Sequence, residues 1–279
     1  MDFYDVIEKL GRGTFGIVYI CSVKHNKQKL VVKEIPIDLV SDDIKRAKNE
    51  ATILKTLNHP NVIKYLDSYI KNFSFYIVME YACHGNLQHY IMKRKADHNY
   101  LEAQAVMDFF CQILMGLNHI HDKGIVHRDL KSENIFITGI NSNVLKIGDF
   151  GISKEMKNGN GDNICANTVI GTCNYMAPEI FDGKPYDNKT DIWALGCILY
   201  QLCQLEKMFE GTVSNVVLSI ASAKLKCVDT KRYGHQMQKL LDLLMKTDPS
   251  QRPDTKSIMS LNDIFPSLYC LYFDLGCIS

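Results

Sequence analysis

A polar stretch from His127 to Asn134, which reads H-R-D-L-K-S-E-N, carries residue types that can do chemistry. It places a carboxylate at Asp129, an ammonium at Lys131 and an amide at Asn134. Apolar residues flank the stretch on both sides, so we predict a polar loop between two buried, strand-like segments. A carboxylate held in such a loop can accept or orient the proton of a hydroxyl group.

A second carboxylate follows at Asp149, in the tripeptide D-F-G that ends at Gly151. Because Mg²⁺ prefers oxygen ligands, Asp149 and the amide oxygen of Asn134 form a candidate metal site. Each segment alone also reads as a turn with satisfied polar side chains, and for an isolated D-F-G that reading is favoured, since short motifs often match by chance. Their occurrence together, in this order, favours a functional site.

A glycine-rich loop, G-R-G-T-F-G, lies near the N-terminus and contains Gly11, Gly13 and Gly16. The pattern also occurs in dinucleotide-binding folds, but there the last glycine opens a helix. Here the strand-like segments Tyr4 to Leu10 and Ile17 to Val23 flank the loop. We therefore predict a hairpin lid whose backbone N–H groups can approach phosphate oxygens, because glycine has no Cβ in the way.

Lys33 ends an apolar run in the predicted strand Leu30 to Ile35 and is expected to point inward, where an unpaired ammonium is costly. Glu50 is the candidate partner on a predicted helix from Asp42 to Leu57, whose start Ser41 would cap. The alternative is that both are edge charges that reach water. With the glycine loop beside them, a buried pair that also serves phosphates explains them better.

The remaining pattern predicts a β-rich small lobe at 1–82 and an α-rich large lobe at 83–279, with a cleft between them. Two further strands would complete five, mostly antiparallel by their short connections. The expected additional elements are strands Val62 to Tyr69 and Phe75 to Glu80, and helices Leu101 to His121, Asp191 to Leu205 and Gln236 to Lys246.

The composition of the 279 residues narrows the class of protein. With 32 basic and 31 acidic residues, the chain has no electrostatic footprint for nucleic acid or an anionic membrane. No run is long enough to span a membrane, and the N-terminus lacks a signal-peptide pattern. The ten cysteines form no C-x-x-C pair, so we expect reduced thiols in a cytoplasmic protein.

Six motifs in sequence order resemble those of a eukaryotic protein kinase over about residues 4 to 260. They are the glycine loop with Val18, Lys33, Glu50, H-R-D with Asn134, D-F-G, and Ala177-Pro178-Glu179. Within kinases the chain resembles the NIMA-related (Nek) serine/threonine family, through H-R-D-L-K-S-x-N-I-F, K-I-G-D-F-G-I-S-K, V-I-G-T and L-C-x-L. The resemblance implies an α+β, bilobal kinase fold in one domain, with a five-stranded antiparallel sheet and one regulatory helix in the small lobe.

The resemblance also implies ATP and Mg²⁺ as cofactors and assigns roles to individual residues. Asp129 would position the substrate hydroxyl, Lys131 would steady the γ-phosphate and Thr172 would support Asp129. Lys33 would hold the α/β-phosphates, oriented by Glu50, while Asn134 and Asp149 would bind Mg²⁺. The implied nucleotide-binding residues are Gly11, Gly13, Gly16, Val18, Val31, Lys33, Met79, Glu80, Ala82 and Phe136.

By resemblance, Arg128 implies control by phosphorylation, with Thr168 as the acceptor. Leu54, Tyr65, His127 and Phe150 would stack as a regulatory spine. Glu179 and Arg252 are expected to form a structural ion pair, and Asp191 to hold the H-R-D backbone.

The chain departs from the Nek pattern in three places. Cys173 and Asn174 replace proline and tyrosine, which puts the substrate-facing surface in doubt. Glu133 replaces glutamine and is expected to add negative charge near the metal site. The segment Phe265 to Ser279 is apolar; it can pack on the large lobe or dock a partner, and we expect packing.

We therefore expect an active serine/threonine protein kinase acting on protein substrates, with a role in mitosis, centrosomes, basal bodies or cilia. The alternatives are a pseudokinase scaffold, which loss of Lys33, Asp129 or Asp149 would have favoured, and a small-molecule phosphotransferase, which the A-P-E segment argues against. We expect a monomer that pairs transiently for autophosphorylation, without nucleic-acid or membrane partners.

Overall fold

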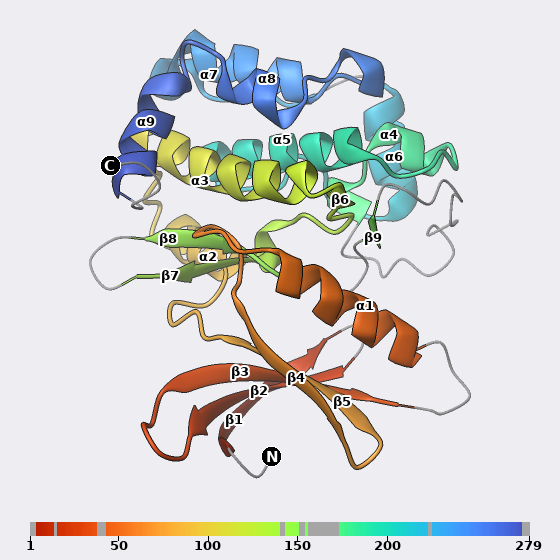
Figure 1. Cartoon of the computed structure of the whole chain (residues 1–279). Helices are drawn as coiled ribbons and strands as arrows, with labels where there is room; N and C mark the ends of the chain where they lie inside the picture. The colour runs from red at the N-terminus through yellow and green to blue at the C-terminus, as the bar shows by residue number, and fades with distance from the viewer. Residues whose placement is uncertain are drawn as a thin grey trace.

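A five-stranded antiparallel sheet, in the order β1-β2-β3-β5-β4, forms the small lobe (Figure 1). The computed structural model describes residues 4–13, 16–37, 43–139, 143–150, 154–155, 173–222 and 225–274. The strands are β1 (Tyr4–Gly13), β2 (Gly16–Val23), β3 (Lys29–Pro36), β4 (Tyr65–Lys71) and β5 (Ser74–Glu80). The predicted α+β, bilobal kinase fold is confirmed.

Helix α1 (Asp43–Thr56) is the only helix that the described residues place in the small lobe, and it packs against the sheet (Figure 1). The predicted apolar stripe is buried, with Ala47, Leu54 and Leu57 each at most 4% exposed. Glu50 lies on the same buried face, at 3% exposure. The predicted cap at Ser41 lies outside the described residues.

The fourth strand begins later than predicted, because residues 59–63 are held by the large lobe instead of by β5. Asn61 is fully buried, and its amide donates hydrogen bonds to Gln112 Oε1 (3.2 Å) and to the Leu145 carbonyl oxygen (2.8 Å). The Ile63 N–H donates to the Ile147 carbonyl oxygen. Val62 therefore makes only an isolated bridge, and regular pairing with β5 starts at Tyr65.

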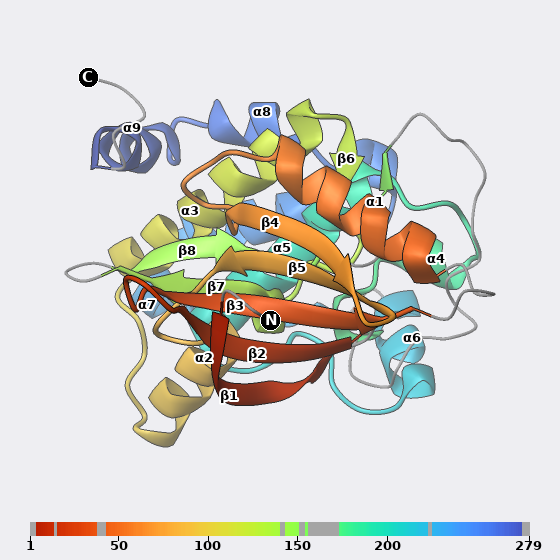
Figure 2. The ribbon, with the colours of Figure 1, turned by 60° about the horizontal axis from the view of Figure 1, so that its bottom comes forward.

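The large lobe is built around two buried helices, α3 and α5, that lie side by side (Figures 1 and 2). Its helices are α2 (Leu87–Ala96), α3 (Ala103–Asp122), α4 (Pro178–Phe181), α5 (Asn188–Gln204), α6 (Val213–Ala221), α7 (Thr230–Leu244), α8 (Thr255–Met259) and α9 (Phe265–Asp274). Among the described residues, no helix combines the length and the apolar character needed to cross a membrane.

Two helices start three or more residues before the predicted position, each for a local reason. Helix α5 starts three residues before Asp191, because Asp187 and Thr190 form a capping box at its N-terminus. Helix α7 starts at Thr230, six residues before the predicted Gln236, and Gly234 interrupts it with a φ of 77°. Trp193 on α5 is fully buried, as predicted for the central helix.

The predicted ion pair between Glu179 and Arg252 joins α4 to the segment before α8. Two guanidinium nitrogens of Arg252 donate to the two carboxylate oxygens, at 2.6 and 2.8 Å. Arg252 is 1% exposed and also lies 5.1 Å from the ring centroid of Trp193. This bidentate pair ties three segments of the lobe together.

Short strands and 3₁₀ turns lie between the helices of the large lobe and carry the polar loops. They are β6 (Ile125–Val126), η1 (Ser132–Asn134), β7 (Ile135–Thr138), β8 (Val144–Ile147), β9 (Lys154–Glu155), η3 (Cys173–Tyr175) and η4 (Pro249–Gln251). The pairs β6–β9 and β7–β8 are antiparallel. The stretch from His127 to Asn134 thus runs between two strands, as predicted.

Candidate active site

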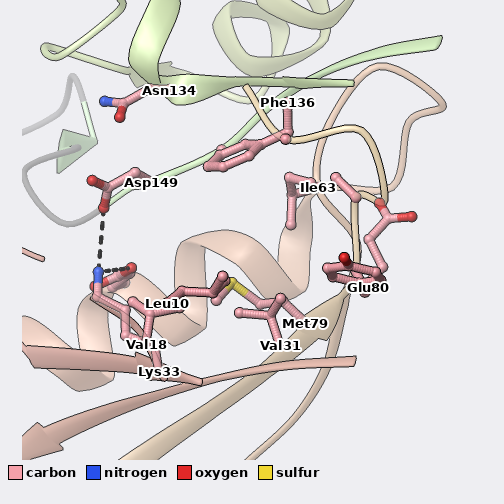
Figure 3. A pocket seen from close by; sticks show the side chains of 15 residues that line it. Leu10, Val18, Val31, Lys33, Ile63, Met79, Glu80, Asn134, Phe136 and Asp149 are labelled. Atoms are coloured by element: carbon pink, nitrogen blue, oxygen red, sulfur yellow. Dashed lines mark hydrogen bonds and ion pairs between the residues drawn. The ribbon is translucent and has the colours of Figure 1, made fainter. Parts of the chain in front are cut away.

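A cavity of about 250 Å³ lies between the lobes, with the sheet that carries Val18, Val31 and Lys33 on one side and β7, which carries Phe136, on the other (Figure 3). Its walls are mainly apolar, with polar groups gathered at one end. The lining residues that the sequence assigned to nucleotide binding are Val18, Val31, Lys33, Met79, Glu80, Ala82 and Phe136. Asn134 and Asp149 line the same cavity.

Other lining residues were not assigned from the sequence. Leu10 and Ile63 add apolar surface, and Tyr81, Gly85 and Gly148 complete the wall. The sequence could have indicated two of them as cavity residues: Leu10 is the last apolar residue before the glycine loop, and Gly148 directly precedes D-F-G. A Cβ on Gly148 would come within 2.9 Å of both Ile63 and Phe136, so close packing requires glycine there.

The three glycines of the predicted lid lie at the β1–β2 hairpin, where Gly13 pairs with Gly16 and Gly11 with Val18. None of them is among the residues that line the cavity. A Cβ on Gly16 would collide with the carbonyl oxygen of Glu34 on β3. Gly16 is therefore required by strand packing, and a contact of these glycines with phosphate stays a prediction.

Lys33 meets two carboxylates inside the cleft. Its ammonium lies 2.7 Å from Glu50 Oε1 and 3.2 Å from Asp149 Oδ1, and its side chain is 6% exposed (Figure 3). Burial would lower the pKa of Lys33, but the two carboxylates outweigh it and the pKa is raised. Lys33 is therefore a fixed cation, and the edge-charge alternative does not hold.

In the catalytic loop, the Asp129 carboxylate and the Lys131 ammonium form an ion pair. Lys131 Nζ donates to both carboxylate oxygens of Asp129, at 2.9 and 2.7 Å. Asn134 Nδ2 donates to Asp129 Oδ2 (3.0 Å) and to the Asp129 carbonyl oxygen (2.8 Å). Burial raises the pKa of Asp129, and the Lys131 ammonium counteracts part of that rise. The carboxylate is thus oriented from two sides.

The donor set of Asn134 and Asp149 fits a hard divalent cation. The Asn134 amide nitrogen is used toward Asp129, which leaves the amide oxygen on the side where Asp149 lies (Figure 3). Burial would raise the pKa of Asp149, but Lys33 outweighs it and the pKa is lowered, so the carboxylate is ionised. Mg²⁺ takes one or two carboxylate or amide oxygens and completes its shell with phosphates and water, which matches two protein ligands.

Asp191 supports the loop from beneath. Its carboxylate accepts hydrogen bonds from the backbone N–H groups of His127 (2.9 Å) and Arg128 (3.0 Å), as predicted, and it lies 2.9 Å from His121 Nε2. These bonds hold Arg128 at a φ of 69°, a conformation that a non-glycine residue rarely adopts. The loop geometry is therefore imposed by α5.

Two residues of the predicted regulatory spine, His127 and Phe150, are in direct contact. The rings of His127 and Phe150 meet edge to face, with centroids 4.9 Å apart, and both side chains are fully buried. Leu54 is buried in the same core cluster, and Tyr65 packs against that cluster. Asp149 consequently points into the cleft while Phe150 points into the core.

Comparison with known proteins agrees with this geometry. The protein kinase domain model matches residues 4–262. The chain is 39% identical over 278 residues to the serine/threonine-protein kinase Nek8 of Danio rerio, and 39% identical over 285 residues to nekl-2 of Caenorhabditis elegans. These matches cover 99% of this chain, 39% of Nek8 and 78% of nekl-2.

The chain belongs to the Nek family of serine/threonine protein kinases. It spans less than half the length of Nek8, and a match to mouse Nek1 at 39% identity covers 21% of that relative. Protein kinases generally use ATP and Mg²⁺.

The expectation for Glu133, one of the departures of this Nek kinase from the family pattern, was wrong. Glu133 was expected to add negative charge near the metal site. Instead, its Oε1 lies 3.3 Å from the ammonium of Lys207, which also sits over the ring of Tyr175. The carboxylate is paired on the side of the loop that faces η3 and α5, because Lys207 lies in the segment just after α5, three residues beyond its last residue, Gln204.

A closed ring of polar contacts, each at hydrogen-bond distance, lies next to the catalytic loop of the Nek kinase. Ser132 Oγ lies 2.7 Å from Gln88 Oε1 and 2.8 Å from the Tyr175 hydroxyl. The Tyr175 hydroxyl donates to Gln201 Oε1 (2.7 Å), and Gln201 Nε2 donates to Gln88 Oε1 (2.8 Å). The ring joins α2, η1, η3 and α5. The sequence contained no signal for it, since its glutamines are separated by more than a hundred residues.

Cys173 and Asn174, the other departures, are both turned inward. Cys173 is 2% exposed and Asn174 is 9% exposed, within η3. Both side chains therefore take part in the packing of η3, and their effect on the substrate-facing surface stays a prediction.

Glu80, at the edge of the cavity, is clamped from both lobes. Its Oε1 accepts from the Lys64 backbone N–H (2.6 Å) and pairs with the ammonium of Lys146 on β8 (2.9 Å). These two contacts fix the end of β5, where the resemblance implies that the Glu80 backbone binds adenine.

Two assigned residues, Thr168 and Thr172, lie outside the described residues. Arg128, the expected partner of Thr168, holds its guanidinium carbon 5.8 Å from the ring centroid of Tyr186.

Proposed function

We propose that this chain is an active, Mg-ATP-dependent kinase that phosphorylates serine and threonine hydroxyls of proteins. The observation that carries the proposal is the simultaneous pairing of Lys33 with Glu50 and with Asp149, at the polar end of an apolar cavity. Pseudokinase scaffolds need none of these pairs.

The apolar walls suit a purine base. Val18 and Val31 from the sheet and Phe136 from β7 would enclose the ring, with Met79 behind it. The backbone of Glu80 and Ala82 would supply the hydrogen bonds, and the Lys146 clamp keeps that backbone in place.

Phosphoryl transfer asks the protein mainly for positioning and charge neutralisation. Bound Mg²⁺ would neutralise the β- and γ-phosphates. Lys33 would orient the α- and β-phosphates, and Asn134 and Asp149 would hold the metal. Asp129 orients the acceptor hydroxyl and takes its proton, while Lys131, already bonded to Asp129, stabilises charge on the transferred group.

We further propose that phosphorylation of Thr168 activates the kinase, with Arg128 exchanging its place over Tyr186 for the phosphate. A cytoplasmic role at centrosomes, basal bodies or cilia, or in mitosis, is proposed on family membership alone. The acceptor segments would be disordered stretches of other proteins.

The test is transfer of labelled phosphate from Mg-ATP to a generic protein substrate, with Asp149→Ala as the inactive control. Mass spectrometry of residues 156–172 would locate autophosphorylation. We expect transfer that the control lacks. Nucleotide binding without transfer, even after Thr168 is phosphorylated by another kinase, would contradict the proposal and favour a scaffold.

A further inference from the structure

A charged pair lies between the catalytic loop and η3, the two segments that a substrate peptide is expected to contact. Glu133 Oε1 lies 3.3 Å from the ammonium of Lys207, which is also 5.7 Å from the ring centroid of Tyr175. Glu133 belongs to η1 and Tyr175 to η3, so Lys207 bridges the two segments. Solvent reaches both partners, since the Glu133 side chain is 34% exposed and that of Lys207 is 21% exposed.

The pair lies within reach of a peptide whose hydroxyl group is held at Asp129. Glu133 follows Asp129 by four residues. Four residues span at most about 14 Å, so a peptide residue within about four positions of the acceptor can cover the same distance. The neighbours of Glu133 are engaged elsewhere, because Ser132 is fully buried and Asn134 donates to Asp129. Glu133 is thus the residue of η1 that can present a charge to a bound peptide.

The charges beside this pair are mainly positive. Lys226 donates to the Lys207 carbonyl oxygen (3.0 Å) and lies 3.4 Å from Glu206 Oε1. Burial would raise the pKa of Glu206, but a hydrogen bond from Tyr200 and the nearby Lys226 and Lys95 outweigh it, and the pKa is lowered. In this group three lysines accompany two carboxylates, those of the catalytic loop and of Glu206, which leaves a net positive charge.

The ammonium of Lys207 keeps hydrogen-bonding capacity for a substrate. An ammonium group carries three N–H donors. Among the described residues its single hydrogen-bond acceptor is Glu133 Oε1, and that contact of 3.3 Å is longer than the roughly 2.8 Å typical of such pairs. A peptide carboxylate can therefore bind Lys207 without displacing Glu133. A peptide ammonium, in contrast, would meet a carboxylate that Lys207 already neutralises.

We propose that Lys207 is a specificity-determining residue, which makes this kinase prefer an aspartate or glutamate close to the acceptor serine or threonine. The inference rests on the proposed function and deepens it, because it names the class of peptide that the site accepts. Glu133 alone would attract lysine or arginine, and Lys207 cancels that attraction. Charges at an interface act on the choice of partner more than on total affinity, so the pair should select among peptides.

Kinetics with matched peptides test the proposal. An uncharged parent peptide with one serine is compared with versions that carry glutamate or arginine at each position up to four residues from the acceptor. The measured quantity is the ratio of kcat/KM for the glutamate peptide to kcat/KM for the arginine peptide, because a ratio within one enzyme does not depend on its overall activity. For the wild-type chain we expect a ratio of at least about five at the most sensitive position, the size expected for a solvent-accessible charge pair.

Variants of both partners assign the preference to the pair. Lys207→Met leaves the charge of Glu133 uncompensated, so the ratio should fall below one. Glu133→Gln should raise the ratio above the wild-type value, because Lys207 loses its competing carboxylate. Lys256→Met is the matched control, since Lys256 on α8 is also paired with a surface carboxylate, that of Asp122, at 2.9 Å. It should keep the wild-type ratio.

Peptide binding separates this inference from the proposed function. Fluorescence anisotropy of the same peptides, labelled and mixed with Mg²⁺ and a non-hydrolysable ATP analogue, reports the preference without phosphate transfer. A preference for glutamate in binding that Lys207→Met reverses supports the inference even if no phosphate is transferred, a result that would contradict the proposed function alone.

Two results overturn the inference: a wild-type ratio of one or less, and a ratio that Lys207→Met leaves unchanged. Thermal melting checks that each variant is folded. Glu133→Gln gives an independent decision if Lys207→Met does not fold, since a ratio in Glu133→Gln at or below the wild-type value also overturns the inference.

Discussion

The ammonium of Lys33 and the carboxylate of Glu50 lie 2.7 Å apart, and both side chains are almost fully buried. Since Lys33 belongs to β3 and Glu50 to α1, this pair reports that the helix is docked on the sheet. The second carboxylate, Asp149, comes from the large lobe. The Lys33 ammonium therefore forms both ion pairs only when β3, α1 and the D-F-G segment are in place together.

Glu50→Gln should lower kcat/KM by at least about 100-fold while the protein stays folded, because Lys33 loses its orienting partner but keeps Asp149. Steady-state kinetics with a peptide substrate would measure the loss. Glu34→Gln is the control, since Glu34 is the next residue on β3 and bonds the Tyr76 hydroxyl on the other face. Equal losses in both variants would contradict the role of the pair.

The acid limb of the pH–rate profile should report Asp129, whose pKa is raised by burial. Activity needs the ionised carboxylate, so the rate falls as pH drops through that raised pKa. Lys131→Met removes a cation that lowers this pKa, so the acid limb of the residual activity should move to higher pH. The exposed Lys184→Met should not move it, and a limb that stays in place in Lys131→Met would exclude Asp129 as the titrating group.

Tyr175→Phe should weaken peptide binding more than nucleotide binding, because it opens the ring between the catalytic loop and η3. Leaving Gln201 Oε1 without its donor should cost about 1–3 kcal/mol of unfolding free energy. We expect a several-fold rise in the KM for peptide and an unchanged KM for ATP.

Tyr233→Phe is the matched control for the ring. Tyr233 is a buried tyrosine whose hydroxyl donates to the carbonyl oxygens of Leu101 and Cys203, away from the cleft. It should lose similar stability in urea denaturation without a change in either KM. If both variants raise the KM for peptide alike, the ring has no specific positioning role.

His59 should make the protein less stable in acid. Burial, His119 and Lys146 lower its pKa from 6.5 to about 4, and its Nδ1 accepts a hydrogen bond from the Asn61 backbone N–H, which requires the unprotonated ring. Between these two values the unfolded chain binds more protons than the native state, so the unfolding free energy falls as pH falls.

His59→Gln should therefore flatten the decline of the melting temperature between pH 7 and about pH 4, the window given by the lowered pKa. The exposed His25→Gln is the control and should keep the wild-type slope. An unchanged slope in His59→Gln would show that other groups dominate the acid response.

The sequence alone determined which residues able to do chemistry the chain contains and in what order they occur. Spacing and residue type predicted the five strands, the regulatory helix, the Lys33–Glu50 pair and the family, because these depend on local periodicity and short motifs. The support of the H-R-D backbone by Asp191 also followed from the family resemblance, without any contact being visible in the sequence.

Tertiary structure alone decided the relations between distant segments. The late start of β4 depends on Asn61 being captured by the large lobe, and the charge of Glu133 is directed by Lys207, which lies far along the chain. The hydrogen-bond ring needs two glutamines from different helices to share one buried site. None of these contacts leaves a local pattern, since hydrogen bonding between remote side chains imposes no periodicity on the sequence around them.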